Sequence, residues 1–371
     1  LKMPKVVRVE LKGKLHPQVS AKDVILEMLR RLTVKGGVGK AYEYVGEGVK
    51  SLTVAQRGTI ANMGAELGAT TSVFPADDEV RKFLKAQGRE EDYTPLYPDE
   101  DCTYDEYMEI DLSSLEPLVA CPSMPDKVVK VKDVEHVKVD QVFIGSCTNG
   151  SYSDIKKAAA VLDGHVVNEN VSLTVAVGTK QILQMLVEDG TMSKLLCSGA
   201  RILECACGPC TGIGQAAPTN GVSVRTSNRN SPGRGGTPDA QLYLVSPEVA
   251  AATAITGYIT EPSKVCDISK LEDITEPDEY IVDDKMLIPP VEGDTSDVEI
   301  IRGPNIKPLP IPEMVRDVIE VPVSLKAGDN ISTDDIIPAS ATFSAMRSNI
   351  PMVAEIVFSR YDKDFVQRAK D

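Results

Sequence analysis

The feature that most constrains the fold is an alternation of short apolar, β-branched runs with runs of helical length, which extends from about residue 127 to residue 257. The runs of strand length lie at residues 137–145, 171–177, 200–203, 222–226 and 242–245. Runs of helical length lie among them at 151–162, 181–187 and 249–256, and the last follows Ser246, Pro247 and Glu248, an N-cap, an N1 proline and an acidic first turn. Strands that alternate with helices in this way are typical of parallel βαβ units. The sequence therefore predicts an α/β fold with mostly parallel sheets.

Three of the predicted strands end directly at unusual polar loops, at residues 146–149, 205–210 and 227–234. In open α/β sheets, ligands bind outside the carboxyl ends of the strands. The three loops therefore indicate one binding site at a single edge of the sheet.

Cysteines from two of these loops suit an iron–sulfur cluster. Cys207 and Cys210 form a C-x-x-C pair in one loop, and Cys147 lies in another. Three thiolates are an awkward number for a closed tetrahedral zinc site, but they suit a [4Fe–4S] cubane that leaves one iron without a protein ligand. An open metal position is what a Lewis-acid catalyst needs.

Two other interpretations of these cysteines compete with a cluster. Cys-Gly-Pro-Cys is also the redox dithiol of thioredoxin-like proteins, although the segment here opens no long amphipathic helix. A structural zinc site is the second alternative. The remaining cysteines are isolated in the sequence and are interpreted as small buried hydrophobic residues: Cys102, Cys121, Cys197, Cys205 and Cys266.

The third loop carries Arg229 and Arg234, five residues apart among Gly, Pro, Ser and Asn. A guanidinium binds a carboxylate through two parallel hydrogen bonds, so two arginines imply a substrate with more than one carboxylate. Exposed loop arginines without a ligand are the alternative.

The charge of the chain disfavours nucleic acid as a ligand. Lys and Arg number 40 against 55 Asp and Glu, which gives a net charge of −15, whereas phosphate backbones demand a basic surface. We find neither a run of about 18 apolar residues, as a membrane span needs, nor the layout of a secretory signal. Eight cysteines in such a chain are interpreted as reduced, intracellular thiols, and we expect a cytoplasmic protein.

The chain divides into four predicted parts. Residues 1–126 form an α/β domain, in which Ser20 and Asp23 begin a helix with a capping box. Residues 127–268 form the α/β domain that carries the cysteines, and 269–315 form an acidic, Pro-rich linker. Residues 316–371 begin a further unit but are too few for a domain of about 100 residues. Position 1 is not Met, so we expect a piece of a longer product.

Several ordered blocks carry a resemblance that covers essentially the whole chain. They are residues 145–149 (GSCTN), 206–210 (ACGPC), 227–230 (SNRN) with 233–234 (GR), 62–75 (NMGAELGATTSVFP), and 329–339 (DNISTDDIIPA) with 347–351 (RSNIP). Together these blocks resemble the aconitase family, in its single-chain bacterial form. The resemblance implies aconitase-like α/β/α domains around a [4Fe–4S] cluster, with a linker to the start of a mobile swivel domain.

The resemblance also implies roles for individual residues. Those that match cluster ligands are Cys147, Cys207 and Cys210. Those that match polar residues around the cluster and its bound hydroxyl are Asn62, Glu66 and Asn228, although Glu66 by itself is typical of a helix-surface acid. Those that match carboxylate-binding residues are Arg229, Arg234 and Arg347. Asp334 matches an aspartate at the start of the swivel domain.

The implied reaction is that of aconitate hydratase, a lyase of the tricarboxylic acid cycle that interconverts citrate and isocitrate through cis-aconitate. Paired arginines stabilise the charge that builds on a carboxylate when the neighbouring carbon loses its proton, and an open iron holds the departing hydroxide. The swivel-like residues 316–371 lie in the same chain, which favours aconitase over homoaconitase or 3-isopropylmalate dehydratase. Asp335 stands where aconitases commonly carry His, whereas isopropylmalate isomerases vary more at this position, so the residue leaves the substrate open.

Two departures from the family pattern bear on activity. The family's first domain and the Ser-Arg-Glu loop of its swivel domain have no counterpart in this sequence, so we expect the isolated chain to be inactive without the missing domains of its parent. A non-enzyme alternative is an RNA-binding regulator, because some members of the family bind RNA after losing the cluster. The net charge of −15 weighs against it.

Overall fold

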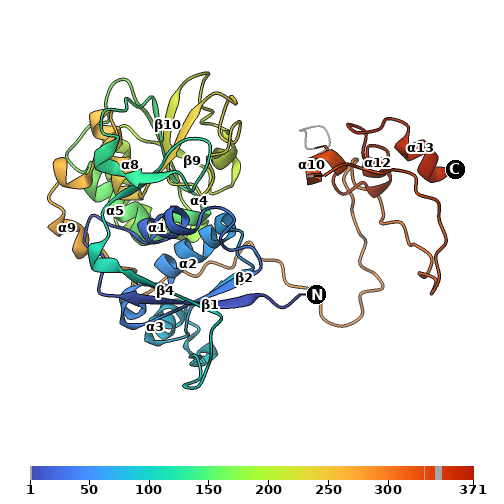
Figure 1. Cartoon of the computed structure of the whole chain (residues 1–371), viewed down its shortest axis with the longest axis horizontal. Coiled ribbons are helices and arrows are strands. Elements are labelled where there is room, and N and C mark those ends of the chain that lie inside the picture. Colours follow the sequence, from blue (N-terminus) through green and yellow to red (C-terminus); the bar gives the residue numbers. More distant parts are fainter. Residues whose placement is uncertain (1, 330, 339–344) are drawn as a thin grey trace. The chain divides into compact units, whose positions relative to one another are not determined.

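The chain forms two compact units, one that ends at Met286 and one that begins at Leu287. The computed structural model describes residues 2–329, 331–338 and 345–371 (Figure 1). The first unit contains both sheets and all three polar loops that the sequence singles out.

The first sheet has four strands in the order β3-β2-β1-β4, and all of its pairs are parallel. The strands are β1 (Lys5–Lys12), β2 (Lys40–Val45), β3 (Thr71–Val73) and β4 (Glu106–Asp111), and the helices of this part are α1 (Ala21–Leu32), α2 (Val54–Gly64) and α3 (Asp78–Ala86). Buried and partly exposed residues alternate along β1, which is the pattern of a strand with one face on the core. The predicted capping box is confirmed: Ser20 accepts a hydrogen bond from the Lys22 amide, and Asp23 accepts one from the Ser20 amide.

The second sheet has seven strands in the order β6-β5-β11-β10-β7-β8-β9. They are β5 (Leu118–Ala120), β6 (Val128–Lys130), β7 (Gln141–Gly145), β8 (Ser172–Ala176), β9 (Arg201–Leu203), β10 (Val222–Arg225) and β11 (Gln241–Leu244). The five strands from β7 to β11 pair in parallel, whereas β5 and β6 are antiparallel. The predicted α/β fold with mostly parallel sheets is confirmed.

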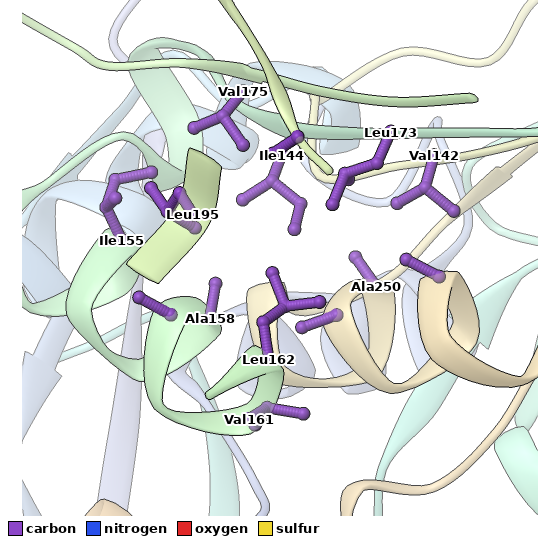
Figure 2. Packing of buried hydrophobic residues seen from close by; sticks show 14 of the residues in the cluster. Val142, Ile144, Ile155, Ala158, Val161, Leu162, Leu173, Val175, Leu195 and Ala250 are labelled. Atoms are coloured by element: carbon purple, nitrogen blue, oxygen red, sulfur yellow. The ribbon is translucent and has the colours of Figure 1, made fainter. Parts of the chain in front are cut away.

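The helices that accompany this sheet are α4 (Ser146–Asn149), α5 (Tyr152–Leu162), α6 (Lys180–Glu188), α7 (Thr191–Cys197), α8 (Pro247–Thr256) and α9 (Ser269–Glu272). Figure 2 shows side chains of β7 and β8, such as Ile144 and Val175, packed against Leu162 of α5 and Ala250 of α8. Small alanines on the helices let them approach the branched side chains of the strands closely, so this face of the sheet excludes water. Figure 1 shows α1 and α2 between the first sheet and the helices of the second, and contacts join α1 to β5 and α2 to α4.

The order of the strands creates a switch point beside β7. From β7 the chain proceeds to β8 and β9 on one side, and it then returns to β10 and β11 on the other. Connections that leave two neighbouring strands in opposite directions open a crevice at the carboxyl ends of those strands. The loops after β7 and β10 therefore border the place where this topology favours ligand binding.

Two predicted boundaries differ from the structure. Residue 126 lies in the turn between β5 and β6, which pair with each other, so the second sheet begins before this position. The stretch predicted as a linker starts with α9, and Leu271 and Tyr280 are buried in the core of the second sheet. Apolar residues among the acids and prolines hold this segment on the domain, and the first unit extends to Met286.

The second unit contains the short helices α10 (Thr333–Ile336), α12 (Ile350–Ala354) and α13 (Phe365–Lys370). Ser332 and Asp335 form a capping box at the start of α10. Among the helices that the structure describes, none combines the length and the apolar character needed to cross a membrane.

Candidate active site

Cys147 lies on a sharp turn at the carboxyl end of β7. Gly145 has a φ of 126°, and a Cβ at this position would lie 1.8 Å from the Ala176 carbonyl oxygen, so only glycine fits. Ser146 follows with a φ of 80°. The turn leads into the single-turn helix α4 and leaves Cys147 exposed while Thr148 is buried.

The end of β7 is bonded to the end of β10. The Gly145 amide donates a 2.8 Å hydrogen bond to Thr226 Oγ1, which in turn donates to the Gly145 carbonyl at 3.0 Å. The loops that carry Cys147 and Asn228 are therefore held together at the switch point.

Cys207 and Cys210 lie in the loop after β9, where Cys210 is buried against Phe143 and Ala176 and Cys207 is exposed. Burial raises the pKa of the Cys210 thiol, and the neighbouring thiols of Cys147 and Cys207 raise it further, whereas Ser146 and Arg234 lower it. Because Cys210 packs with residues of β7 and β8, and Cys147 directly follows β7, the cysteine loops lie at the ends of neighbouring strands. All eight cysteines are free thiols.

The donor set fits the cluster that the sequence predicts. Within the described residues, no three His, Cys, Asp or Glu side chains converge closely enough to hold one metal ion. A cubane does not require such convergence, because each thiolate binds a different iron. Soft thiolate sulfur is also the ligand type that iron–sulfur clusters take.

Asn62 belongs to α2, a helix that packs on the first sheet, and its side chain contacts the loop that carries Cys147. Its Nδ2 donates to Cys147 Sγ at 3.5 Å, and its Oδ1 accepts a 3.0 Å hydrogen bond from Thr148 Oγ1. Thr59, one turn earlier on α2, donates to the Thr148 carbonyl at 2.7 Å. α2 thus holds the amide of Asn62 against the predicted cluster ligand.

Glu66 connects α2 to the third loop. It lies in a short 3-10 turn after α2, at Ala65–Leu67, and its side chain is 12% exposed. Glu66 Oε1 accepts hydrogen bonds from Asn228 Nδ2 at 3.2 Å and from Arg229 Nε at 2.9 Å. The structure therefore brings three predicted site residues into direct contact.

The other predicted site residues are placed as follows. Arg234 is half-buried beside Cys210, close enough to act on its pKa. Arg347 is exposed in the second unit. Asp334 belongs to α10 of that unit, but its side chain lies outside the described part of the chain. Cys102 and Cys197 are exposed and the other three isolated cysteines are only partly buried, so the expectation that these five are buried is wrong.

Lys22 is a residue of this site that the sequence analysis missed. It is fully buried, and its Nζ donates to the carbonyls of Thr226 and Ser227, both at 2.8 Å. Burial lowers the pKa of Lys22 to about 7. The available signal was a basic residue in the first turn of a helix, where the helix dipole disfavours positive charge.

Arg225 is the second missed residue. It is fully buried at the end of β10 and donates to the carbonyl of Pro209, which lies between the two cysteines of the C-x-x-C pair. A charged residue at the end of a predicted strand, directly before a polar loop, was its sequence signal.

Comparisons with known proteins agree with this geometry. A model of the aconitase family (aconitate hydratase) matches residues 1–257. The chain belongs to the aconitase family. This member is 43% identical over 266 residues to 3-isopropylmalate dehydratase large subunit 1 of Thermotoga maritima, a match that covers 71% of this chain and 64% of the relative.

Two further relatives are similar at the same level. One is 3-isopropylmalate dehydratase large subunit 2 of Archaeoglobus fulgidus, 42% identical over 262 residues, with 70% of this chain and 63% of the relative covered. The other is the homoaconitase large subunit of Thermus thermophilus, 43% identical over 268 residues, with 71% and 62% covered. The chain thus spans less than two thirds of the length of each of these relatives.

These relatives correct one expectation from the sequence. The prediction of an aconitate hydratase of the tricarboxylic acid cycle is wrong, because the similar proteins are 3-isopropylmalate dehydratases and a homoaconitase. The physical reason is that the matched blocks hold the predicted cluster ligands and the predicted carboxylate-binding arginines, which the resemblance assigns to a chemistry common to the family. The substrate is distinguished by contacts to the part of it that differs, and those blocks carry no such information.

Proposed function

We propose that the protein to which this chain belongs is a hydro-lyase that reversibly dehydrates and rehydrates a hydroxy-carboxylate with at least two carboxylates. The reaction that we propose first is that of a 3-isopropylmalate dehydratase, the name carried by relatives of 42–43% identity. Homoaconitase is the second candidate, because a relative of that name is 43% identical. The observation that carries the proposal is the contact of Glu66 with Asn228 and Arg229 beside the cysteine loops.

A [4Fe–4S] cluster is the cofactor of the proposed enzyme, and its ligands are Cys147, Cys207 and Cys210. When bound, the cluster would supply a Lewis acid at the iron that no cysteine ligates.

The remaining side chains have roles that follow from their contacts. Arg229 and Arg234 bind substrate carboxylates through their guanidinium groups, which work locally against the net charge of −15. Glu66 Oε1 accepts both of the hydrogen bonds described above, and we assign proton exchange with the substrate to Oε2. The amides of Asn62 and Asn228 orient the reacting groups beside Cys147 and Glu66.

Two residues of the second unit keep the roles that the family resemblance implies, Arg347 as a carboxylate-binding residue and Asp334 as a catalytic residue. Because the relatives are named large subunits, we propose a small subunit as the partner of the whole protein. We expect residues 1–371 by themselves to be inactive or nearly so.

The test uses the full-length protein with its partner subunit, reconstituted anaerobically with iron and sulfide. We expect turnover of 3-isopropylmalate, and a preference for homoaconitate instead would select the second candidate. A preparation that holds about four irons and turns over neither substrate would contradict the proposal. In the same assay, Glu66→Gln removes the group to which proton exchange is assigned, and Glu169→Gln is its matched control because Glu169 is exposed.

A further inference from the structure

Arg225 joins three segments around the cysteine loop through one buried guanidinium. Its Nη1 donates to the Pro209 carbonyl at 3.0 Å, and its Nη2 donates to the carbonyls of Gln215 at 2.7 Å and Gly235 at 3.0 Å. Nε donates to Ser223 Oγ at 2.9 Å, on the same strand. The side chain therefore ties the loop between Cys207 and Cys210, and the segment that follows Arg234, to β10.

The backbone is shaped to admit this side chain. A Cβ at Gly235 would lie 2.7 Å from Arg225 Nη1 and 2.8 Å from its Cζ. Both approaches are closer than side chains tolerate, so glycine at this position leaves the space that the guanidinium occupies. The arginine and the glycine form one packed unit.

The charge of Arg225 lacks a carboxylate partner among the described residues, where no Asp or Glu oxygen lies within ion-pair distance of it. Burial lowers the pKa of Arg225 to about 10. The guanidinium lies over the ring of Phe143, 5.9 Å from its centroid, and Cys210 packs on the same ring. A buried cation is costly unless an anion compensates it.

We propose that Arg225 is a positioning residue of the cluster site, which anchors the Cys207–Cys210 loop and provides the buried positive charge that faces the Cys210 thiolate and the anionic cluster. The inference rests on the proposed function, because the cluster is part of that proposal. The inference goes beyond the proposed cluster ligands, because it assigns to the Arg225 guanidinium the role of holding Cys210 in place.

The test compares Arg225→Met, Arg225→Lys and Gly235→Ala with the unchanged chain. Arg225→Met removes the charge and the hydrogen bonds. Arg225→Lys keeps the charge but loses the planar set of N–H donors that the guanidinium provides. Gly235→Ala displaces the guanidinium and leaves Arg225 in the sequence. Leu26→Ala is the control for lost stability, because Leu26 is buried in the core of the first sheet, away from the loop.

The first readout is hydrogen exchange in the protein without a cluster. The amides of Gly212 and Ile213 donate to the carbonyls of Pro209 and Gly208, so they report the order of the loop. We expect Arg225→Met and Gly235→Ala to raise their exchange rates at least about tenfold, and Leu26→Ala to leave them within about twofold of the unchanged chain under conditions where local opening dominates. Exchange in Arg225→Met and Gly235→Ala equal to that of the unchanged chain would overturn the anchoring role.

The second readout is the rate at which a chelator removes iron from the reconstituted protein. We expect Arg225→Met to release iron at least about tenfold faster than the unchanged chain. Arg225→Lys, which keeps the charge, should release it clearly more slowly than Arg225→Met. Equal release from the Met variant and the unchanged chain would overturn the charge role. If the unchanged chain takes up no iron, the proposed function fails and the charge role fails with it, while the exchange measurement still decides the anchoring.

Discussion

Lys22 Nζ donates a 2.8 Å hydrogen bond to the main-chain carbonyl of Thr226. This bond joins helix α1, which accompanies the first sheet, to the end of β10 in the second sheet. The neighbouring carbonyl of Ser227 accepts a second bond of the same length. Thr226 in turn holds the Gly145 turn that precedes Cys147. One buried ammonium therefore fixes the two loops that carry Cys147 and Asn228.

We expect Lys22→Met to lower the free energy of unfolding by about 2 kcal/mol or more, because it leaves two buried carbonyls without a donor. Urea unfolding followed by circular dichroism measures the change. Lys14→Met is the control, since Lys14 is exposed, and it should change stability by less than about 0.5 kcal/mol. Equal effects of the two substitutions would contradict the assigned role of Lys22.

Asp23 makes stability depend on pH. Burial raises the pKa of this carboxyl from 3.8 to about 7, so the folded protein binds more protons than the unfolded chain between these values. The contribution of Asp23 to the free energy of unfolding is therefore fully present below about pH 4, and it is lost as the pH rises through about 7. Burial also raises the pKa values of Asp154, Glu248 and Glu276, so a comparison with Asp23→Asn isolates this one group.

The measurement is urea unfolding of the unchanged chain and of Asp23→Asn between about pH 4.5 and 7.5. We expect the stability advantage of the unchanged chain to shrink by at least about 1 kcal/mol over this range. Lys22 acts in the opposite direction from about pH 7 upward, because its lowered pKa makes stability rise with pH between about 7 and 10.5, and it is present in both proteins. A difference that is constant with pH would show that Asp23 does not titrate as described.

Gly145→Ala tests the turn before Cys147. A methyl group would lie 1.8 Å from the Ala176 carbonyl oxygen in a backbone with a φ of 126°, and we expect a loss of about 2 kcal/mol or more in the free energy of unfolding. Gly164→Ala is matched in having a φ of 79° but has nothing within 4 Å of the added Cβ. It should therefore show the backbone strain without the clash, at about 1 kcal/mol. Equal losses of unfolding free energy in the two variants would mean that the backbone at the end of β7 shifts to accommodate the added methyl group.

Glu66→Gln tests the proposed proton exchange in the complete enzyme. Glutamine keeps an oxygen for Asn228 and Arg229 but cannot exchange a proton, so kcat should fall at least about 100-fold, while iron content and unfolding stay unchanged. Steady-state kinetics, iron analysis and thermal denaturation measure these quantities. A variant that retains most of its kcat would remove Glu66 from the reaction, and one that loses iron would make its role structural.

Local features of this chain were predictable from sequence, and contacts between distant segments were not. The Ser20–Asp23 capping box and the strand end at Gly145 depend on neighbouring residues, so their patterns are visible in the chain. The bond from Lys22 to Thr226 joins residues 204 positions apart, and no local pattern encodes it. The antiparallel pairing of β5 and β6 was missed for a similar reason, because two three-residue strands carry too little periodicity to identify.

The site residues could be predicted from the sequence, but the substrate could not. Asn62, Glu66, Asn228 and Arg229 could be named because they lie in recognisable blocks. The structure bonds Asn62 to Cys147, and Glu66 to Asn228 and Arg229. Their chemistry is common to a family with several substrates. The substrate therefore could not be read from them, and the expectation of aconitate hydratase failed at that step.

The most direct test of the account is the iron and acid-labile sulfide bound per chain after anaerobic reconstitution. The unchanged chain should hold about four irons, and Cys147→Ser, Cys207→Ser and Cys210→Ser should each lose them. Cys197→Ser is the control, because Cys197 is also exposed but lies on α7, outside the cysteine loops, and it should retain the full iron content. Four irons retained in Cys147→Ser, or a single zinc bound by Cys207 and Cys210 in place of iron, would contradict the three-thiolate cluster.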